Sequence, residues 1–230
     1  AQAVTGLDRL GFNIVNLTFL LVIVYAGFSL FQSKTGKAKG ISGLVLVIML
    51  GLLGWSYSSM DSTVSILPQI FQQFNPFFVI VLTPVSLAVF GYLAKKKKEP
   101  SAPRKIGIGM VIAACGFLIM ALGSLGLPTP AAVAADSKLQ VLVSPNWLIS
   151  TYLVLTFAEL LLSPMGISFV SKVAPPKYKG MMMGGWFVAT AIGNYLVAII
   201  GYLWGGMQLW MVWSVLIVLC LLSALFMFSI

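Results

Sequence analysis

Residues 208–229 read QLWMVWSVLIVLCLLSALFMFS and contain no charged side chain. A helix of about 20 apolar residues is long enough to cross the hydrocarbon core of a bilayer. Similar runs recur along the chain, which predicts an all-α fold, a polytopic transmembrane helical bundle of about seven spans. The predicted spans are 11–32, 41–59, 76–94, 105–126, 146–170, 181–203 and 208–229.

The composition excludes several classes of function. Of the 230 residues, 60% are hydrophobic and 8% are charged, against about 45–50% and about 25% in ordinary soluble domains. The basic residues form short clusters between apolar runs, without a recognisable nucleic-acid-binding module, so no nucleic-acid partner is expected. The chain has no histidine, which removes the commonest metal ligand and proton shuttle. We therefore expect no enzymatic activity, no metal and no cofactor.

The lysines and arginines predict the orientation in the membrane. If seven spans alternate, twelve of the 14 basic residues fall on one side, in loops 33–40, 95–105 and 171–180. Basic loops remain in the cytoplasm, so these three are predicted to be cytoplasmic and the amino terminus outside, in a cytoplasmic (inner) membrane. The run Lys95–Lys98 is interpreted as a topology anchor rather than an anionic-lipid site.

The first apolar run is predicted to be a helix rather than a signal sequence, because lysines follow it instead of a small-residue cleavage site. The chain begins with Ala1 rather than Met, as expected of a processed or partial chain. Residues 1–59 are predicted to form a two-helix transmembrane hairpin, and residues 60–230 a five-helix bundle.

Glu159 is the one acidic residue inside a predicted span. A carboxylate near the bilayer centre costs at least about 2.5–3.5 kcal/mol, so it must face a cavity or a partner. The alternative is a protonated Glu159 that binds a neighbouring helix for packing. Ser163 follows one turn later on the same helix face, as either a site residue or a packing residue. Pro164 leaves the carbonyl of Leu160 without its usual N–H donor, as expected beside a mid-membrane cavity.

Two further residues are candidates with structural alternatives. Asn75 precedes Pro76 at the start of the third span, where an asparagine can simply cap a helix. Trp186 follows the small-residue stretch 180–185 and can be an interface anchor, a core side chain or the wall of a pocket.

Several stretches closely resemble the proton-dependent oligopeptide transporters of the major facilitator superfamily. Residues similar to their helices ten and eleven are FAELLLSPMGISF (157–169), APP (174–176), GMMMGGWF (180–187) and GNYL (193–196). Residues similar to their helix eight and the following loop are NPFF (75–78), TPV (83–85), EPS (99–101) and Pro103. The resemblance covers residues 66–230 and implies that the last five spans are helices eight to twelve. The first span would then be helix six or part of an additional hairpin, and the second span helix seven.

The resemblance also implies a function. Glu159 is similar to the glutamate that receives the amino terminus of a peptide, with Ser163 one turn away. Asn75 resembles the helix-eight asparagine that contacts the peptide, and Trp186 resembles an aromatic residue of the pocket wall. The chain is accordingly expected to be the carboxy-terminal part of a proton-coupled di/tripeptide symporter, contributing half of the central site. Its expected partners are di/tripeptides, protons as the coupling ion, the lipid bilayer, and an amino-terminal six-helix bundle or other membrane subunits.

One departure from the family keeps other functions open. The family's helix seven ends with a Glu-Gln pair, whereas residues 54–60 contain no acidic residue. The main alternative is a transporter-derived structural membrane subunit, the scaffold of a larger complex without transport activity. An ion or proton channel subunit is a weaker alternative, because Glu159 has no second titrating group within the spans to relay a proton.

Overall fold

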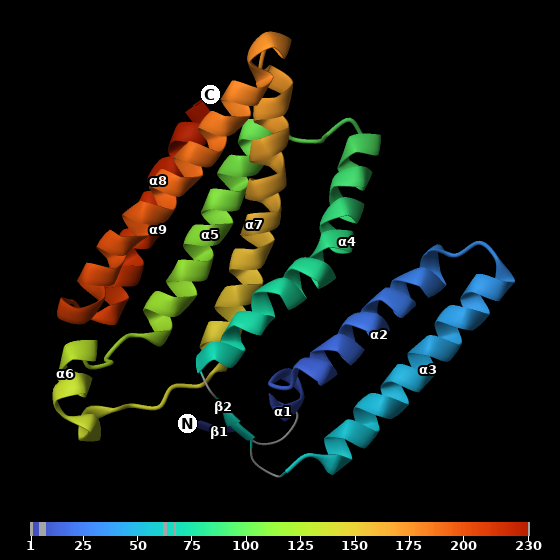
Figure 1. The fold of residues 1–230 in the computed structure, drawn as a ribbon, viewed down its shortest axis with the longest axis horizontal. Helices are drawn as coiled ribbons and strands as arrows, with labels where there is room; N and C mark the ends of the chain where they lie inside the picture. The colour runs from blue at the N-terminus through green and yellow to red at the C-terminus, as the bar shows by residue number, and fades with distance from the viewer. Residues whose placement is uncertain (1, 5–7, 62–63, 67, 230) are drawn as a thin grey trace. The chain divides into compact units, whose positions relative to one another are not determined.

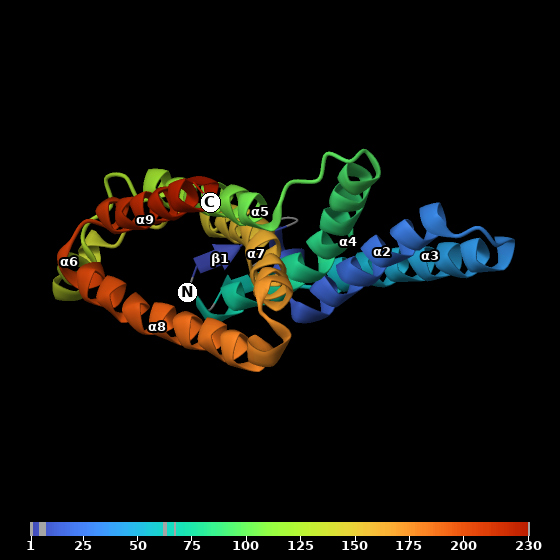
Figure 2. The same cartoon turned by 90° about the horizontal axis from the view of Figure 1, so that it is seen from above.

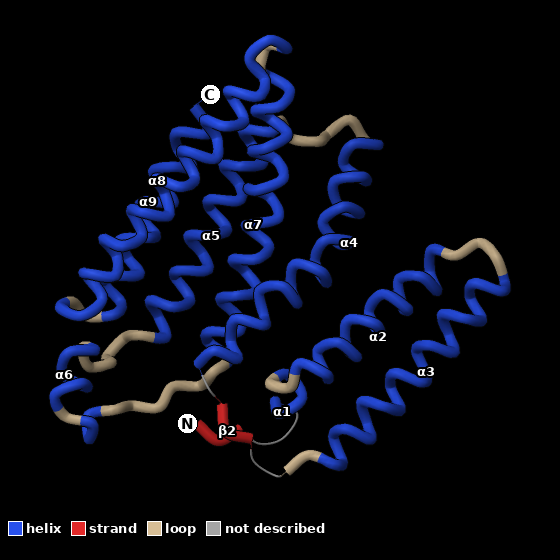
Figure 3. Tube along the Cα trace, in the orientation of Figure 1, coloured by secondary structure: helices blue, strands red, loops and turns tan. Residues whose placement is uncertain are grey.

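The computed structural model describes residues 2–4, 8–61, 64–66 and 68–229. Within this part of the chain, seven helices are long and apolar enough to cross a membrane, which confirms the all-α prediction and the span count. Figures 1 and 3 show these helices and the short elements between them. The spanning helices are α2 (Ile14–Gln32), α3 (Gly36–Ser59), α4 (Phe74–Lys95), α5 (Ala102–Gly123), α7 (Asn146–Val173), α8 (Lys179–Gly206) and α9 (Leu209–Ser229).

The remaining elements are short. They are α1 (Asp8–Gly11), α6 (Pro130–Ala135), three 3₁₀ turns at Pro68–Gln73, Ser137–Leu139 and Pro176–Tyr178, and the strands β1 (Gln2–Val4) and β2 (Val64–Ile66). The strands pair antiparallel, with Ala3 opposite Ser65. Such strands are not predicted from the sequence, because three residues leave almost no periodic signal.

The basic loop predicted at residues 33–40 is shorter than expected. Helix α3 already begins at Gly36, so Lys37 and Lys39 lie in its first turns. Lysine is a good helix former, and a spanning helix can continue into water beyond the hydrocarbon core. Loop 95–105 is likewise shortened, because α5 begins at Ala102 with a proline in its first turn. Hydropathy therefore placed each span but not the ends of the helices.

The chain divides into two compact units, Ala1–Ala88 and Val89–Ile230, and the boundary falls inside α4. Each unit is described by itself. The predicted division into a hairpin, residues 1–59, and a bundle, residues 60–230, assigns the spans to helices of the family. That assignment stays a prediction. The predicted exterior position of the amino terminus concerns Ala1, which lies outside the described residues.

In the first unit, polar contacts join the antiparallel helices α2 and α3. Asn16 is fully buried, accepts a hydrogen bond from the Ser56 hydroxyl at 2.7 Å and donates to the Met60 sulfur at 3.4 Å. Further along the pair, the Ser42 hydroxyl donates to Ser29 Oγ at 2.7 Å. Because lipid supplies no hydrophobic force between helices, such interhelical hydrogen bonds and close packing hold the pair together.

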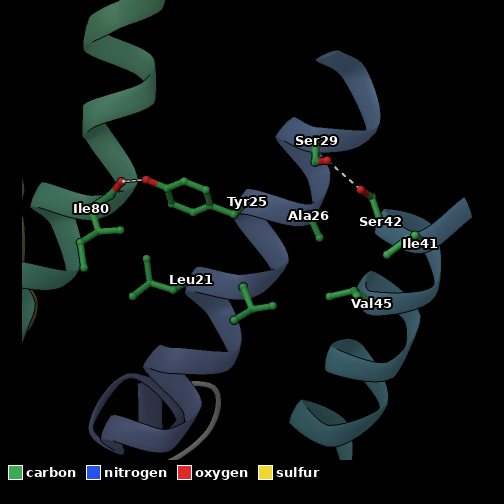
Figure 4. A pocket seen from close by; sticks show the side chains of 9 residues that line it. Leu21, Tyr25, Ala26, Ser29, Ile41, Ser42, Val45 and Ile80 are labelled. Carbon is green, nitrogen blue, oxygen red and sulfur yellow. Dashed lines mark hydrogen bonds between the residues drawn. The ribbon is translucent and has the colours of Figure 1, made fainter. Parts of the chain in front are cut away.

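A second contact in the first unit compensates a proline. Pro84 lies inside α4 and has no N–H, so it cannot donate to the carbonyl of Ile80 four residues earlier. The Tyr25 hydroxyl of α2 donates to that carbonyl instead, at 3.0 Å, as Figure 4 shows. The contact gives a hydrogen-bond donor to a carbonyl that the helix leaves unpaired, and it ties α2 to this part of α4.

In the second unit, α5 packs along both α7 and α9. Its buried positions are mostly small residues, which allow helix backbones to approach closely. They include Gly107, Gly109, Ala113, Ala114, Gly116 and Ala121. At the end of α5, Ser124 accepts a hydrogen bond from the Trp213 indole of α9 at 3.2 Å.

Helix α8 differs from its neighbours because none of its residues is buried. Figure 2 shows α8 running apart from α5 and α9 within this unit. Its exposed apolar side chains include Phe187, Tyr195 and Tyr202. In a membrane-spanning helix such a surface can face lipid, another protein segment or a cavity.

The close approach of α5 and α7 predicts that Gly109→Ala is destabilising. A Cβ at Gly109 would lie 3.1 Å from Leu161 Cβ and 3.2 Å from the backbone oxygen of Ala158, and a backbone oxygen cannot move aside as a side chain can. We expect the free energy of unfolding to fall by about 1 kcal/mol. Thermal unfolding of the purified chain in detergent measures this change.

The matched control is Gly201→Ala on α8, where nothing lies within 4 Å of an added Cβ. We expect no loss of stability there, because alanine is the better helix former. Equal melting temperatures for the two variants would contradict the close α5–α7 packing.

Candidate functional site

Glu159 and Ser163 lie on the exposed face of α7, one helical turn apart. The opposite face carries Ala158 and Leu161, which are each 2% exposed and approach Gly109 of α5. The structure thus directs the carboxylate away from the packed α5–α7 contact. The same-face prediction for Glu159 and Ser163 follows from the 3.6-residue period and agrees with this placement.

Helix α7 continues through Pro164 to Val173 without a break. The proline therefore removes one hydrogen bond, to the carbonyl of Leu160, but does not divide the helix. Pro164 is exposed, like Ser163 beside it. A carboxylate, a hydroxyl and an under-bonded carbonyl consequently occur within five residues of one spanning helix, which concentrates polar groups at a single level of the membrane.

Trp186 lies against α7 at Gly166. A Cβ added to Gly166 would lie 2.3 Å from the far edge of the Trp186 ring, so the indole occupies space that only a glycine leaves open. The ring also lines a cavity of about 630 Å³, together with Leu162 and Phe169 of α7. Among the three alternatives for Trp186, the structure therefore places it at a pocket wall.

Gly166 as the partner of Trp186 is not predicted from the sequence. Gly166 lies three residues beyond Ser163, on the neighbouring face of α7, and it is buried. A glycine inside a spanning helix is a signal for close approach, but nothing in the sequence names the side chain that approaches it.

Asn75 belongs to the first unit, whereas Glu159, Ser163 and Trp186 belong to the second. Asn75 is half-buried and lies in the first turn of α4, which begins at Phe74 directly after the 3₁₀ turn Pro68–Gln73. The alternative of a simple N-cap is therefore wrong, because the backbone is already helical before Asn75. Phe74 beside it is buried, makes an edge-to-face contact with Phe12 and stacks on Phe78, at 5.6 and 6.0 Å between ring centroids.

The first unit has a cavity of its own, of about 440 Å³, between α2, α3 and the first part of α4. Figure 4 shows Leu21, Tyr25, Ile41 and Val45 around it. Its polar groups are engaged, since Tyr25 donates to Ile80 and Ser42 donates to Ser29. The cavity offers no carboxylate or ammonium group to a charged solute, so it is a weaker candidate for a polar substrate than the exposed face of α7.

A buried cation lies at the start of α5. Lys105 is 5% exposed, forms an ion pair with Glu99, and places its Nζ 4.5 Å from the centroid of the Phe90 ring. The carboxylate and the ring face compensate a charge that has left water. This contact connects the last turns of α4, the following loop and the first turn of α5.

Comparison with known proteins places this arrangement in a family. A peptide transporter, YePEPT of Yersinia enterocolitica, is 37% identical over 131 residues, which are 57% of this chain and 24% of that protein. The dipeptide and tripeptide permease B of Salmonella typhimurium is 29% identical over 208 residues, 80% of this chain and 40% of the permease. The chain thus spans less than half the length of these relatives.

A solved structure has a similar fold. It is that of a POT family transporter in complex with a thioalcohol-conjugated peptide, and it matches 93% of this chain and 39% of its own with a TM-score of 0.54 and 24% identity. This likeness shows that the helices of the two proteins are arranged in a similar fold. The transporter relatives and the seven apolar helices together identify an integral membrane protein.

The model of the POT family (PTR2) matches residues 52–205, more than half of the chain and all of α7 with Glu159 and Ser163. The expected resemblance to oligopeptide transporters is thereby confirmed, and the chain belongs to the POT family.

Proposed function

We propose that this chain is the carboxy-terminal part of a proton-coupled di/tripeptide symporter and contributes half of its central peptide site. The observation that carries the proposal is the exposed carboxylate of Glu159 on a spanning helix whose opposite face is packed. An acid in such a position requires an aqueous cavity or a charged partner. The peptide transporters and permeases among the relatives support a peptide as that partner.

Each candidate residue has a chemical role in this proposal. Glu159 accepts charge-assisted hydrogen bonds from the peptide's ammonium group, an interaction strengthened by low dielectric surroundings. Ser163 supplies a hydroxyl one turn away, and Trp186 forms an apolar wall for a side chain. Asn75 contributes an amide that can both donate to and accept from the peptide backbone. Recognition of the peptide ends leaves the choice of side chains loose.

Coupling and orientation complete the proposal. Protons are the coupling ion, and an amino-terminal six-helix bundle is the partner that binds the peptide carboxylate. The basic loops around residues 33–40, 95–105 and 171–180 face the cytoplasm of an inner membrane, following the distribution of lysine and arginine. Transport proceeds by rocking of the two bundles about the site. The chain by itself therefore supplies only half of the binding site and does not transport.

Proteoliposomes that hold this chain together with the amino-terminal bundle of a POT relative test the proposal. We expect an inward proton gradient to drive accumulation of dialanine, and we expect N-acetyl-dialanine to be excluded. The acetyl group removes the positive charge that Glu159 binds and changes little else. Equal uptake of the two compounds would contradict recognition of the ammonium group.

The second candidate is a transporter-derived scaffold subunit, and the absence of an acidic residue from residues 54–60 at the end of α3 favours it. A scaffold needs no peptide site. Isothermal titration of the purified assembly with dialanine separates the two candidates, because only the transporter gives a saturable heat of binding.

A further inference from the structure

The cavity beside Trp186 has an apolar lining for which recognition of a peptide ammonium group has no use. It lies between α5, α7, α8 and α9, has a volume of about 630 Å³, and its walls are almost entirely apolar, with Ile106, Leu162, Phe169 and Phe226 among them. The one hydroxyl in its lining, that of Ser223, donates to the carbonyl of Leu219 at 2.8 Å. The walls therefore suit an apolar chain and offer little to a polar solute.

One end of this cavity is strongly basic. Ile106 lines the cavity and lies two residues after Arg104, while Val170 lines it and lies two residues before Lys172. Lys177 follows in the connection to α8, and Lys179 is the first residue of α8. These four basic side chains, Arg104, Lys172, Lys177 and Lys179, are exposed, and we name this group the basic end.

Little negative charge opposes the basic end. None of its four cations forms an ion pair with another residue in the part of the chain that the structure describes. The carboxylate of Glu99, before α5, is bound to Lys105. The basic end is consequently suited to an anion, directly beside an opening into apolar space.

We propose that this cavity and the basic end form a binding site for an anionic phospholipid such as phosphatidylglycerol. One acyl chain lies between α8 and the α5–α7–α9 group, and the phosphate lies among Arg104, Lys172, Lys177 and Lys179. Basic pockets between spanning helices bind anionic head groups, and an acyl chain gains free energy with each buried CH₂ group. Charge complementarity favours this occupant over a zwitterionic lipid or an uncharged apolar helix.

The site also accounts for the packing of α8. This helix has no buried residue, and Trp186 meets α7 at Gly166. A lipid chain in the cavity supplies apolar contacts that neighbouring helices do not. Trp186 is the one candidate peptide-site residue that lines the cavity, whereas Glu159, Ser163 and Asn75 do not, so the lipid proposal does not depend on recognition of the peptide ammonium group.

Native mass spectrometry tests the site on the purified chain. The chain is reconstituted in vesicles of equal parts phosphatidylcholine and phosphatidylglycerol, extracted gently, and examined for retained lipid. We expect one phosphatidylglycerol per chain, preferred over phosphatidylcholine by roughly tenfold because several cations face one phosphate. Equal retention of the two lipids, or retention of neither, would overturn the proposal.

Two pairs of variants locate the site. The triple variant Lys172→Gln, Lys177→Gln, Lys179→Gln should reduce the preference to near one. The matched triple variant Lys96→Gln, Lys97→Gln, Lys98→Gln removes equal charge from the loop directly after α4, where no residue lines the cavity, and should keep the preference. Equal effects of the two triple variants would show nonspecific attraction and overturn the site.

The second pair concerns the acyl chain. Met110→Trp fills part of the cavity and should abolish retention, whereas Met120→Trp on the same helix, outside the lining, should retain the lipid. Circular dichroism checks that both variants fold. Should Met110→Trp fail to fold, the exposed lysine variants still decide the proposal; a folded Met110→Trp that keeps the lipid would exclude the cavity.

Discussion

Replacing Glu159 with Gln is expected to abolish peptide-driven proton uptake while leaving the protein folded. Glutamine has nearly the same shape and keeps hydrogen-bonding capacity, but it cannot carry the negative charge that an ammonium group requires. Hydrogen bonds to charged groups contribute about 1.5–3 kcal/mol, so dialanine affinity should fall roughly 10- to 100-fold. Because Glu159 is exposed on α7, the substitution leaves the contact of Ala158 and Leu161 with α5 intact.

The measurement is acidification inside proteoliposomes on addition of dialanine, with the chain paired with an amino-terminal bundle. The matched control is Asp136→Asn, which removes a carboxylate outside the spanning helices. Asp136 accepts a hydrogen bond from the Lys138 amide at 3.0 Å, and an asparagine oxygen can do the same. Proton uptake by the Glu159→Gln protein at the parent rate would show that Glu159 is not part of the peptide site.

The largest effect on stability is expected from Glu99→Gln. Lys105 is buried and its ammonium group depends on the Glu99 carboxylate and the Phe90 ring. Removal of one partner from a fully buried ion pair costs about 3–5 kcal/mol. The Glu99 side chain is still 40% exposed, so water replaces part of the interaction, and we expect a loss of about 2–3 kcal/mol.

The companion variant Lys105→Met separates a lost ion pair from a lost contact. Methionine is of similar length, fills the buried space and needs no counterion, so we expect Lys105→Met to be close to neutral. Denaturant titration in detergent measures both variants. If Lys105→Met destabilised the chain as much as Glu99→Gln, the interaction itself, rather than an unpaired buried charge, would determine stability.

Parts of the candidate site could be predicted from the sequence and parts could not. Glu159 is conspicuous because it is the one acid inside a spanning run, and Ser163 follows it by one turn of a regular helix. The partner of Trp186 could not be predicted, because the approach of Gly166 joins two helices through space. The partners of the Ile80 carbonyl and of the Lys105 ammonium group, namely Tyr25 and Glu99, depend equally on how helices and loops come together.

The sequence by itself determined that the chain spans a membrane about seven times and where each span lies, because bilayer thickness sets the length of an apolar helix. It also determined the family and the helix that carries the lone acid. Only the tertiary structure decided which face of each helix is packed, such as Ala158 and Leu161 of α7 against Gly109 of α5. A helix that is apolar on all sides has no hydrophobic stripe to mark its inner face. The packed face is therefore determined by where small residues let neighbouring helices approach closely.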